Sequence, residues 1–395
     1  MASKNIKRDK SMEIKPDVET FAKIKVVGIG GSGNSAINRM ISSKIRGVEF
    51  VAINTDAQAL HHSKATTKLH IGKMTTKGLG AGMDPELGLK AAEENQDEIH
   101  EMLKGSDMVF ITCGLGGGTG TGASPVIADI SKDVGALTVA TVTKPFGFEG
   151  EQRSILAERG LNDLAEKVDS IITIPNDRIL QIIDKKTSLL DSFAIVDDVL
   201  RQGVQGISDL ITVPGLINVD FADVKAIMEN TGSALMGIGK GSGESRAVDA
   251  AKSAIDSPLL ELSIDGAKGI LFTISGGPGL GMYEVNEAAK VITANADSNA
   301  KVIFGAVIDE DKKDEICITV IATGFGERGK AIKKISATRL DPFGKKEEES
   351  ENKKEKKKVP FEPVAPISTT TPQEQVKKKE EEELEIPAFI RKKMM

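Results

Sequence analysis

The chain has 395 residues, of which 39% are hydrophobic and 28% are charged, and its formal net charge is −6. This length exceeds what one hydrophobic core usually serves, so two domains are expected. An acidic balance with no tryptophan and a single tyrosine disfavours a nucleic-acid partner, which requires basic surface and stacking aromatic rings.

Sequence features that mark secretion, membrane insertion or a metal centre are missing. The first ten residues are polar, and no stretch approaches eighteen apolar residues, so we expect neither a signal peptide nor direct membrane insertion. The two cysteines, Cys113 and Cys317, are far apart in the sequence, which fits a reducing cytoplasm. The four histidines match no zinc spacing, so no metal-ligating residue is assigned.

The first part of the chain reads as alternating strands and helices. Residues 1–22 are polar and are predicted to form a flexible extension. From Lys23 to about Ile183, short apolar runs alternate with helical patterns, which predicts βαβ units and a mostly parallel sheet. Strands are predicted at Ile24–Ile29, Phe50–Ile53, Asp107–Thr112, Leu137–Val142 and Ser170–Ile174.

Two glycine-rich loops follow predicted strands. The first, Gly28–Asn34, satisfies the dinucleotide fingerprint G-x-G-x-x-G through Gly28, Gly30 and Gly33, and alone it would favour a nicotinamide or flavin enzyme. A dinucleotide fold does not require a second, richer glycine loop after a later strand. Two such loops on one sheet edge suit a mononucleotide with a long phosphate tail.

The second loop, Gly114–Gly122, is the most informative feature of the chain. Six of its nine residues are glycine, and each ordered glycine costs roughly 0.5–1 kcal/mol relative to alanine. A strand, a glycine turn and a helix N-terminus together form an anion-binding geometry. Neither loop contains lysine or arginine, so backbone N–H groups, hydroxyls and a divalent cation must meet the phosphate charge.

A third glycine-containing segment, Gly78–Pro85, also precedes a predicted helix. A plain turn and a third phosphate-facing loop are equally compatible with its sequence.

A long helix and a second unit follow. Apolar residues recur at steps of three and four over 189–213, which predicts a central helix that ends at Pro214-Gly215. The second unit spans 214–328. Its predicted strands are Ala234–Ile238, Gly269–Ile274, Val302–Val307 and Ile316–Ala322, and its predicted helices are Ser245–Ile255 and Tyr283–Ala296.

The end of the chain changes character. Residues 329–384 are rich in lysine, glutamate, proline and threonine and predict a disordered charged linker. Residues 385–395 turn apolar again around Ile386–Ile390. A short apolar peptide on a polar tether is typical of a partner-docking motif.

Two carboxylates stand just after the central helix, at Asp220 and Asp223. Their i, i+3 spacing puts both on one face of the helix that begins there, where they could polarise a water molecule or hold a cation. On spacing alone, however, a helix N-cap and a first-turn acid are the favoured interpretation.

The motifs together resemble the tubulin/FtsZ family of GTPases, and within it the bacterial cell-division branch, FtsZ. The resemblance covers about residues 23–326 and includes the tail peptide. Its motifs are Gly116–Gly122, Gly28–Asn34, Asn54–Asp56, Pro145–Gly150, Ile174–Asp177 and Asn218–Asp223. It implies a tubulin-like α/β fold with a parallel-sheet GTP-binding domain (23–188), the central helix (189–213) and a smaller GTPase-activating α/β domain (214–328), followed by the disordered tail.

The resemblance also implies the nucleotide-binding residues. Glu149 and Arg153 should meet the ribose and its neighbourhood, and Asn176, Phe193 and Asp197 should hold the guanine. A carboxylate at Asp197 can accept hydrogen bonds from the N1–H and N2–H₂ edge of guanine. The residues implied around the phosphates are Gly30, Gly31, Asn34, Ala81, Gly82, Gly117, Gly118, Thr119 and Gly120.

The same resemblance reverses the interpretation of the acidic pair. In the family, Asn218, Asp220 and Asp223 insert over the GTP of the next subunit in a head-to-tail filament, so hydrolysis requires polymerisation. The expected ligands are GTP or GDP with Mg²⁺, and dependence on a monovalent cation is open. The implied function is a cytoplasmic filament that forms the division ring at midcell beneath the inner membrane. Its implied partners are its own copies and, through residues 385–395, membrane-tethering and regulatory division proteins such as FtsA.

Two further hypotheses compete with this one. A dinucleotide-dependent oxidoreductase requires the first glycine loop but leaves 116–122 and 218–223 unexplained. A purely structural filament would bind GTP without turning it over, and a tubulin-like filament not dedicated to division is a variant of it. Asp220 and Asp223 argue against a filament that does not hydrolyse GTP. The tail peptide argues against a filament that is not dedicated to division.

Overall fold

The computed structural model describes residues 22–325 except 182, 184–185, 214, 258–262, 295, 310–311 and 313. Apart from Ala22, the predicted N-terminal extension lies outside the described residues, and so do the predicted linker 329–384 and tail peptide 385–395. Within the described part of the chain, no helix combines the length and apolar character needed to cross a membrane.

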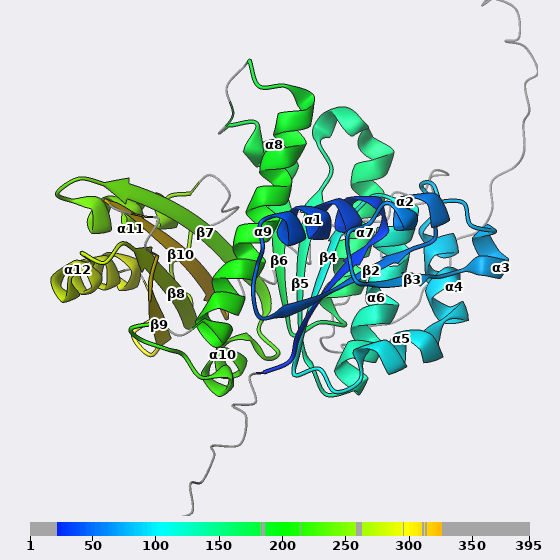
Figure 1. Cartoon of the computed structure of the whole chain (residues 1–395). Helices are drawn as coiled ribbons and strands as arrows, with labels where there is room; N and C mark the ends of the chain where they lie inside the picture. The colour runs from blue at the N-terminus through cyan, green and yellow to red at the C-terminus, as the bar shows by residue number, and fades with distance from the viewer. Residues whose placement is uncertain are drawn as a thin grey trace, which may run out of the picture. The chain divides into compact units, whose positions relative to one another are not determined.

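Six parallel strands form the first part of the sheet (Figure 1). Their order is β3-β2-β1-β4-β5-β6. The strands are β1 (Ile24–Ile29), β2 (Val48–Asn54), β3 (Thr67–His70), β4 (Met108–Gly114), β5 (Leu137–Lys144) and β6 (Ser170–Pro175). The five predicted strands are confirmed. The sequence analysis did not predict β3, because this short edge strand has the sequence TKLH and contains no apolar run.

The strand order creates a crevice at one edge of the sheet. From β1 the chain moves outward to β2 and β3, and then returns to β4 on the other side of β1. Helices therefore leave the carboxyl ends of β1 and β4 toward opposite faces. Ligands of open α/β sheets bind at such a switch point, and the two glycine loops lie there.

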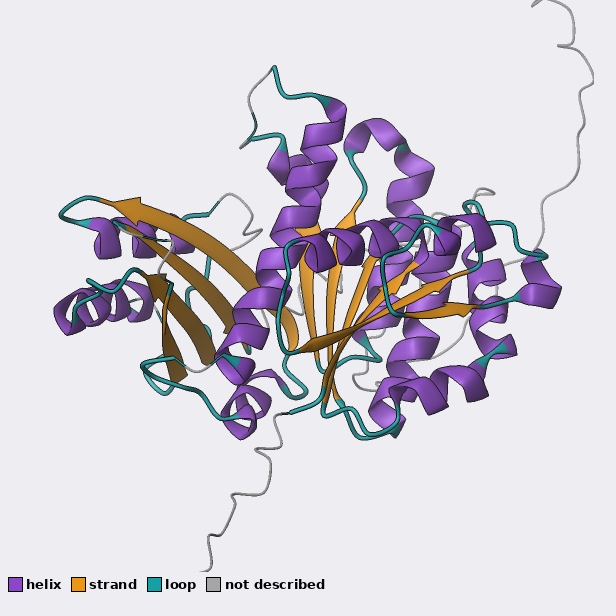
Figure 2. Cartoon of the chain, viewed as in Figure 1, coloured by secondary structure: helices purple, strands orange, loops and turns teal. Residues whose placement is uncertain are grey.

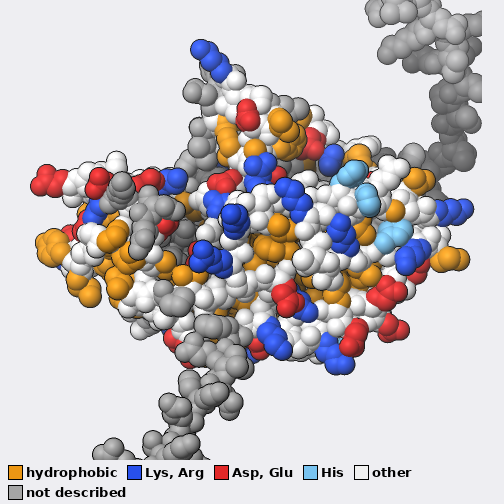
Figure 3. All heavy atoms as spheres, viewed as in Figure 1, with side chains coloured by type: hydrophobic (Ala, Val, Ile, Leu, Met, Phe, Trp, Pro, Cys, Tyr) orange, Lys and Arg blue, Asp and Glu red, His pale blue; other side chains and the backbone are white. Residues whose placement is uncertain are grey.

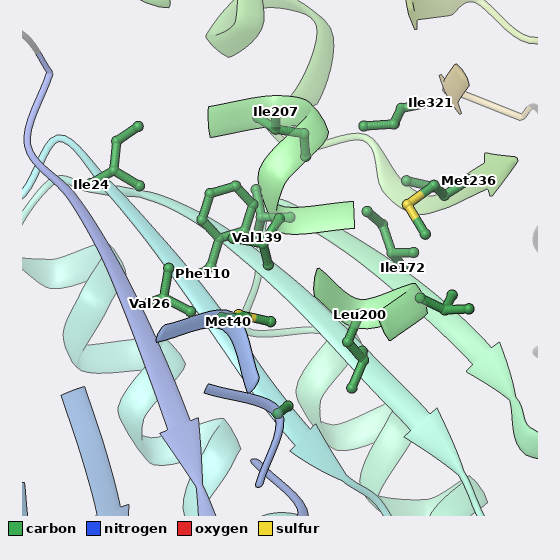
Figure 4. Packing of buried hydrophobic residues seen from close by; sticks show 14 of the residues in the cluster. Ile24, Val26, Met40, Phe110, Val139, Ile172, Leu200, Ile207, Met236 and Ile321 are labelled. Atoms are coloured by element: carbon green, nitrogen blue, oxygen red, sulfur yellow. The ribbon is translucent and has the colours of Figure 1, made fainter. Parts of the chain in front are cut away.

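Helices cover both faces of this sheet (Figure 2). One face packs Val26, Phe110 and Val139 against α1 (Gly30–Ser42), α2 (Ala57–His61) and α9 (Leu189–Thr212). Figure 4 shows Met40 of α1 and Leu200 of α9 in this layer. The opposite face packs against the other set of long helices. They are α4 (Pro85–Glu94), α5 (Gln96–Leu103), α6 (Gly118–Asp133) and α7 (Glu151–Ala165).

Three short helical segments complete this part. They are α3 (Lys73–Thr76), the 3₁₀ turn η1 (Gly147–Glu149) and α8 (Asn176–Ile179).

The remaining strands extend the same sheet. The antiparallel strand β10 (Glu315–Thr323) lies between β7 (Gly232–Ser242) and β8 (Gly269–Gly276), and β9 (Lys301–Ile308) pairs with β8 in parallel. The helices are α10 (Phe221–Met228), α11 (Arg246–Ile255) and α12 (Met282–Thr293). The four strands and two helices predicted for this unit are confirmed within a few residues.

The central helix α9 joins the two parts. It begins at the predicted position, where the Ser188 hydroxyl accepts a hydrogen bond from the Asp191 N–H. Its residue Ile207 packs in one cluster with Ile172 of β6, Met236 of β7 and Ile321 of β10 (Figure 4). Because β7 also pairs with β6, the sheet continues past the predicted boundary at 213/214.

Candidate functional site

The two glycine loops touch each other at the carboxyl ends of β1 and β4. Gly30 opens α1 with a φ of +71°, and a Cβ there would lie 3.0 Å from the backbone nitrogen of Gly120. Glycine is therefore required at Gly30 both by conformation and by the close approach of the second loop. The N-termini of α1 and α6 are held side by side as a result.

The third glycine segment, Gly78–Pro85, contacts the second glycine loop. The Gly118 N–H donates to the Gly82 carbonyl at 2.7 Å, and a Cβ on Gly118 would lie 2.6 Å from the Ala81 carbonyl oxygen. Ala81 is buried, whereas Gly82 is exposed. The structure thus brings together all three loops that the sequence analysis singled out.

Two glycines in these loops, Gly31 and Gly117, are required neither by packing nor by a left-handed backbone conformation. A Cβ on Gly31 or Gly117 would meet no atom within 4 Å, and Gly117 has an ordinary φ of −94°. Both stand at the start of long helices, where N–H groups lack intrahelical acceptors and the helix dipole favours an anion. Glycine at these positions fits a ligand that approaches the backbone closely.

Three hydroxyls of the loops have hydrogen-bond partners within the protein. The Thr121 hydroxyl accepts a hydrogen bond from the Gly116 N–H at 2.9 Å, and the Ser32 hydroxyl accepts one from Gly114 at 2.9 Å. Thr119 instead shares a hydrogen bond with Thr55, with 2.6 Å between the two hydroxyl oxygens. The sequence analysis did not single out the Thr55 hydroxyl, because the contact joins residues 64 positions apart.

Two buried asparagines carry unpaired amide atoms. Asn34 on α1 is 4% exposed and Asn176 on α8 is 6% exposed. Both side-chain atoms of Asn34 and the Oδ1 of Asn176 have no hydrogen-bond partner in the structure. Because buried polar groups are nearly always paired, these atoms fit a polar ligand that supplies the missing partners.

Glu149 and Arg153 are fixed beside the second glycine loop. The Glu149 Oε1 accepts from the Phe146 N–H at 2.8 Å, and its Oε2 lies 3.2 Å from Arg153 Nη1. A Cβ on Gly116 would lie 2.7 Å from the Arg153 carbonyl oxygen. The Glu149–Arg153 ion pair is therefore positioned beside the second glycine loop.

Phe193 and Asp197 stand one turn apart on α9. Burial raises the pKa of Asp197 from 3.8 to about 6, and the guanidinium of Arg39 acts in the opposite direction. Arg39 Nε lies 3.5 Å from Asp197 Oδ2. The Phe193 ring packs edge-on against Phe146 at 5.7 Å and remains 42% exposed. Arg39 is a neighbour that the sequence analysis missed, because it comes from α1.

Asn218, Asp220 and Asp223 lie at the other edge of the sheet. Asp220 lines a hollow together with Lys23 and Asp107, and these last two residues directly precede β1 and β4. Figure 1 shows α10 at the lower end of the sheet, away from α8. The glycine loops follow the carboxyl ends of β1 and β4, so a strand length of about 20 Å separates the two groups.

The acidic loop has local structural contacts of its own. The Asp220 Oδ1 accepts a hydrogen bond from the Ala222 N–H at 3.2 Å and caps α10. The Asn218 Oδ1 accepts one from Gly215 at 2.6 Å. Asn218, Asp220 and Asp223 are all exposed. The capping role inferred from spacing is confirmed, and it leaves the second oxygen of Asp220 outside that hydrogen bond.

Comparison with known families identifies both parts of the fold. Residues 23–184 match the Tubulin/FtsZ family GTPase domain, and residues 232–326 match the FtsZ family C-terminal domain. The structure of an empty FtsZ dimer from M. jannaschii is 48% identical, with 79% of this chain and 90% of that chain covered and a TM-score of 0.76. The chain belongs to the FtsZ family. It therefore has a tubulin-like fold and is a GTPase.

More distant tubulin-like structures share the fold. The GTPγS-bound protofilament of CetZ2 from Haloferax volcanii is 22% identical, with a TM-score of 0.67 and coverage of 80% of this chain and 97% of that chain. The GDP-bound monomer of CetZ1 from the same organism is 21% identical, with a TM-score of 0.68 and coverage of 80% and 98%. At these identities the likeness concerns the fold.

The oxidoreductase hypothesis is not supported. The segment that carries its fingerprint, Gly28–Gly33, lies inside the matched GTPase domain. Among the described residues, no group of three or more His, Cys, Asp and Glu side chains is placed to hold a metal ion.

Proposed function

We propose that this FtsZ-family chain is a self-assembling filament protein of the division ring, which hydrolyses GTP at the head-to-tail contact between subunits. One observation carries the proposal: the acidic loop with Asp220 and the glycine loops lie at opposite edges of the same sheet. A single copy cannot bring them together. Two copies in a head-to-tail arrangement can, and such a contact repeats without closing.

Each part of GTP has a proposed set of ligands. Glu149 and Arg153 meet the ribose region, and Asn176, Phe193 and Asp197 hold the guanine. The unpaired amide atoms of Asn34 and Asn176 support this placement. The proposed phosphate ligands are Gly30, Gly31, Asn34, Ala81, Gly82, Gly117, Gly118, Thr119 and Gly120.

Magnesium is part of the proposal as a charge-neutralising ion. Bound with GTP, Mg²⁺ would offset the charge that develops on the phosphate oxygens. The Thr55 and Thr119 hydroxyls, 2.6 Å apart, are oxygen atoms of the kind that Mg²⁺ prefers.

The proposed catalytic groups come from the neighbouring subunit. Asp220 and Asp223 would orient a water molecule toward the γ-phosphate, with Asn218 holding the shape of the loop through Gly215. Positioning and electrostatic stabilisation account for most catalysis of phosphoryl transfer. Capping of α10 by one oxygen of Asp220 orients the other for this role.

The experiment that tests the shared site is GTP turnover per molecule as a function of protein concentration, with Mg²⁺ present and sedimentation alongside. We expect a threshold concentration at which activity and sedimentable polymer appear together. Turnover that does not depend on concentration would contradict the shared site. Polymer without turnover would favour a structural filament.

GDP binding is expected to weaken as the pH falls below 6. Burial raises the pKa of Asp197 to about 6, and a protonated carboxyl cannot accept both guanine N–H groups. The effect on folding has the opposite sign. Because the pKa is higher in the folded chain than in the unfolded one, protonation between pH 7 and 4 favours the folded state.

The measurement is the GDP dissociation constant between pH 5 and 8, with thermal unfolding at each pH. In Asp197→Asn, which does not titrate, the part of the pH dependence centred near 6 should disappear. If the mutant and the parent show the same profile, Asp197 does not contact the base.

Residues 385–395 are proposed to dock a membrane-tethering or regulatory division protein such as FtsA, which would hold the filament at midcell in the cytoplasm beneath the inner membrane. Deletion of 385–395 is expected to abolish this recruitment while GTP turnover stays unchanged, since the matched GTPase and C-terminal domains end at 326. Localisation of a fluorescent fusion and a GTPase assay measure the two effects. Loss of GTP turnover in the deletion variant would contradict the proposal that residues 385–395 serve recruitment alone.

A further inference from the structure

The three glycine loops offer no cationic side chain to a phosphate group, because none of them contains lysine or arginine. Arg39 and Arg153, which flank the proposed nucleotide site, pair with Asp197 and Glu149. Phosphoryl transfer is catalysed largely by positive charge held against the phosphates. A cation in addition to Mg²⁺ is therefore expected from outside these loops.

The head-to-tail contact of the proposed function, on which this inference rests, makes that need greater. It would bring Asp220 and Asp223 of one subunit against the triphosphate of the next. Carboxylates and phosphates are both negative, and like charges that meet across an interface oppose association. A cation beside the two carboxylates would offset this repulsion.

Lys23 lies beside Asp220. Both residues line one hollow at the amino ends of β1 and β4, together with Asp107 and Phe221. Lys23 directly precedes β1 and is exposed. The hollow therefore brings a lysine and the proposed catalytic carboxylate to one place.

Backbone hydrogen bonds fix the position of Lys23. Its N–H donates to the Asp107 Oδ2 at 2.7 Å. Its carbonyl accepts from the N–H groups of Asp107 and Met108 at 2.9 and 3.3 Å. Ile24 and Met108, the first residues of the two strands, are buried. The Lys23 side chain therefore starts from a fixed point at the edge of the sheet.

The charge of Lys23 is available to a ligand. Acidic and basic side chains occur next to one another along the lower margin of the molecule in Figure 3. Two other lysines near this edge are engaged, since Lys104 lies 3.3 Å from Glu101 and Lys25 donates to the Met102 carbonyl. Within the part of the chain that the structure describes, the Lys23 ammonium has no ion-pair or hydrogen-bond partner.

We propose that the Lys23 ammonium contacts the phosphate oxygens of GTP in the next subunit and stabilises the charge that develops on them during hydrolysis. Lysine suits this role, because it has three donors on a long stem. In the reaction the water oxygen bonds to the γ-phosphorus, and the bond to the bridging oxygen breaks with its electron pair left on GDP. The water protons leave with inorganic phosphate, and Lys23 keeps its own proton.

The experiment uses the full chain with GTP and Mg²⁺. Lys23→Gln removes the charge and Lys23→Arg keeps it. Lys104→Gln is the matched control, because Lys104 also lies near this edge but does not line the hollow. The measurements are turnover per sedimented subunit, the threshold concentration for polymer, GDP affinity and thermal unfolding.

Lys23→Gln should lower turnover per sedimented subunit about 10- to 100-fold, somewhat less than the loss of a buried preorganised donor. Lys23→Arg should stay within about three-fold of the parent, and Lys104→Gln should match it. GDP affinity and thermal unfolding should not change in any of the three variants, because each altered side chain is exposed and lies far from the nucleotide of its own subunit.

Mixing experiments locate the group. A Gly117→Val chain is blocked at the phosphates but retains Lys23, so its equimolar copolymer with Lys23→Gln should regain activity at about a quarter of the contacts. A copolymer of Lys23→Gln with Asp220→Asn should stay at the mean of the two separate activities. In that mixture no subunit offers Lys23 and Asp220 together.

Unchanged turnover in Lys23→Gln overturns the inference. So does a raised threshold with unchanged turnover per sedimented subunit, since Lys23 would then only attract the next subunit. Recovery of activity in the mixture with Asp220→Asn also overturns it, because the two groups would then act at different contacts. If Asp220→Asn keeps full turnover, or the parent shows no threshold, the proposed function itself fails.

Discussion

Asp220→Asn is expected to lower GTP turnover about 10²–10³-fold, the order of loss on removing one preorganised catalytic group, because the neutral amide no longer orients the attacking water as the carboxylate does. Nucleotide affinity should not change, because Asp220 lies at the opposite edge of the sheet from the glycine loops of its own subunit. Asparagine is as good an N-cap as aspartate, so the cap of α10 is kept and only the charge is lost. Single-turnover hydrolysis and GDP binding measure the two effects.

A mixing experiment tests whether the site is shared. Asp220→Asn retains its nucleotide loops, and a Gly117→Val chain, blocked at the phosphates, retains Asp220. In a random equimolar copolymer, about a quarter of the contacts join intact halves, so activity should return. Sedimentation shows whether both chains enter the polymer. A copolymer without activity would mean that both groups serve one subunit.

Gly117→Ala is expected to weaken GTP and GDP binding about 10- to 100-fold, or roughly 1.4–2.8 kcal/mol. In the structure a Cβ at this position meets nothing within 4 Å, so the methyl group would clash only with a bound phosphate. Stability should change by less than about 1 kcal/mol, because the lower entropy of the unfolded chain offsets a poorer N-cap. Binding titrations and chemical denaturation separate the two effects.

Two other glycines provide the controls for that prediction. Gly279 also has open space around its Cβ position, lies between β8 and α12, and should tolerate alanine without loss of nucleotide affinity. Gly118→Ala should destabilise the fold itself, because its Cβ would lie 2.6 Å from the Ala81 carbonyl oxygen. Unchanged affinity in Gly117→Ala would mean that phosphate does not approach this loop.

Local patterns were sufficient to predict most of the architecture. Buried parallel strands such as β4 are continuous apolar runs, and α9 carries a three-and-four repeat, so each signal lies within a few adjacent residues. The edge strand β3 was missed because it contains no apolar run and only Leu69 packs against the core. The glycine loops were found because glycine is costly to order and is seldom repeated without a reason.

The candidate site was only partly predictable. The local sequence around Asp220 predicted a helix N-cap, and the structure confirms that Asp220 caps α10. A catalytic role for Asp220 was suggested by family resemblance, and its proposal now rests on its position at the far edge of the sheet. The Arg39–Asp197 pair and the Thr55–Thr119 pair join residues 158 and 64 positions apart, which no local pattern encodes.

The sequence by itself determined every strand except β3, the central helix, the three glycine loops and the family, because each depends on the identity of neighbouring residues and their spacing. Only the tertiary structure decided which loops touch, which glycines face open space, which amide atoms lack partners and which charged residues share the hollow with Asp220. These properties depend on how the parallel strands are ordered and on which face each helix packs. Strand order and helix placement follow from contacts between residues that are far apart in the sequence.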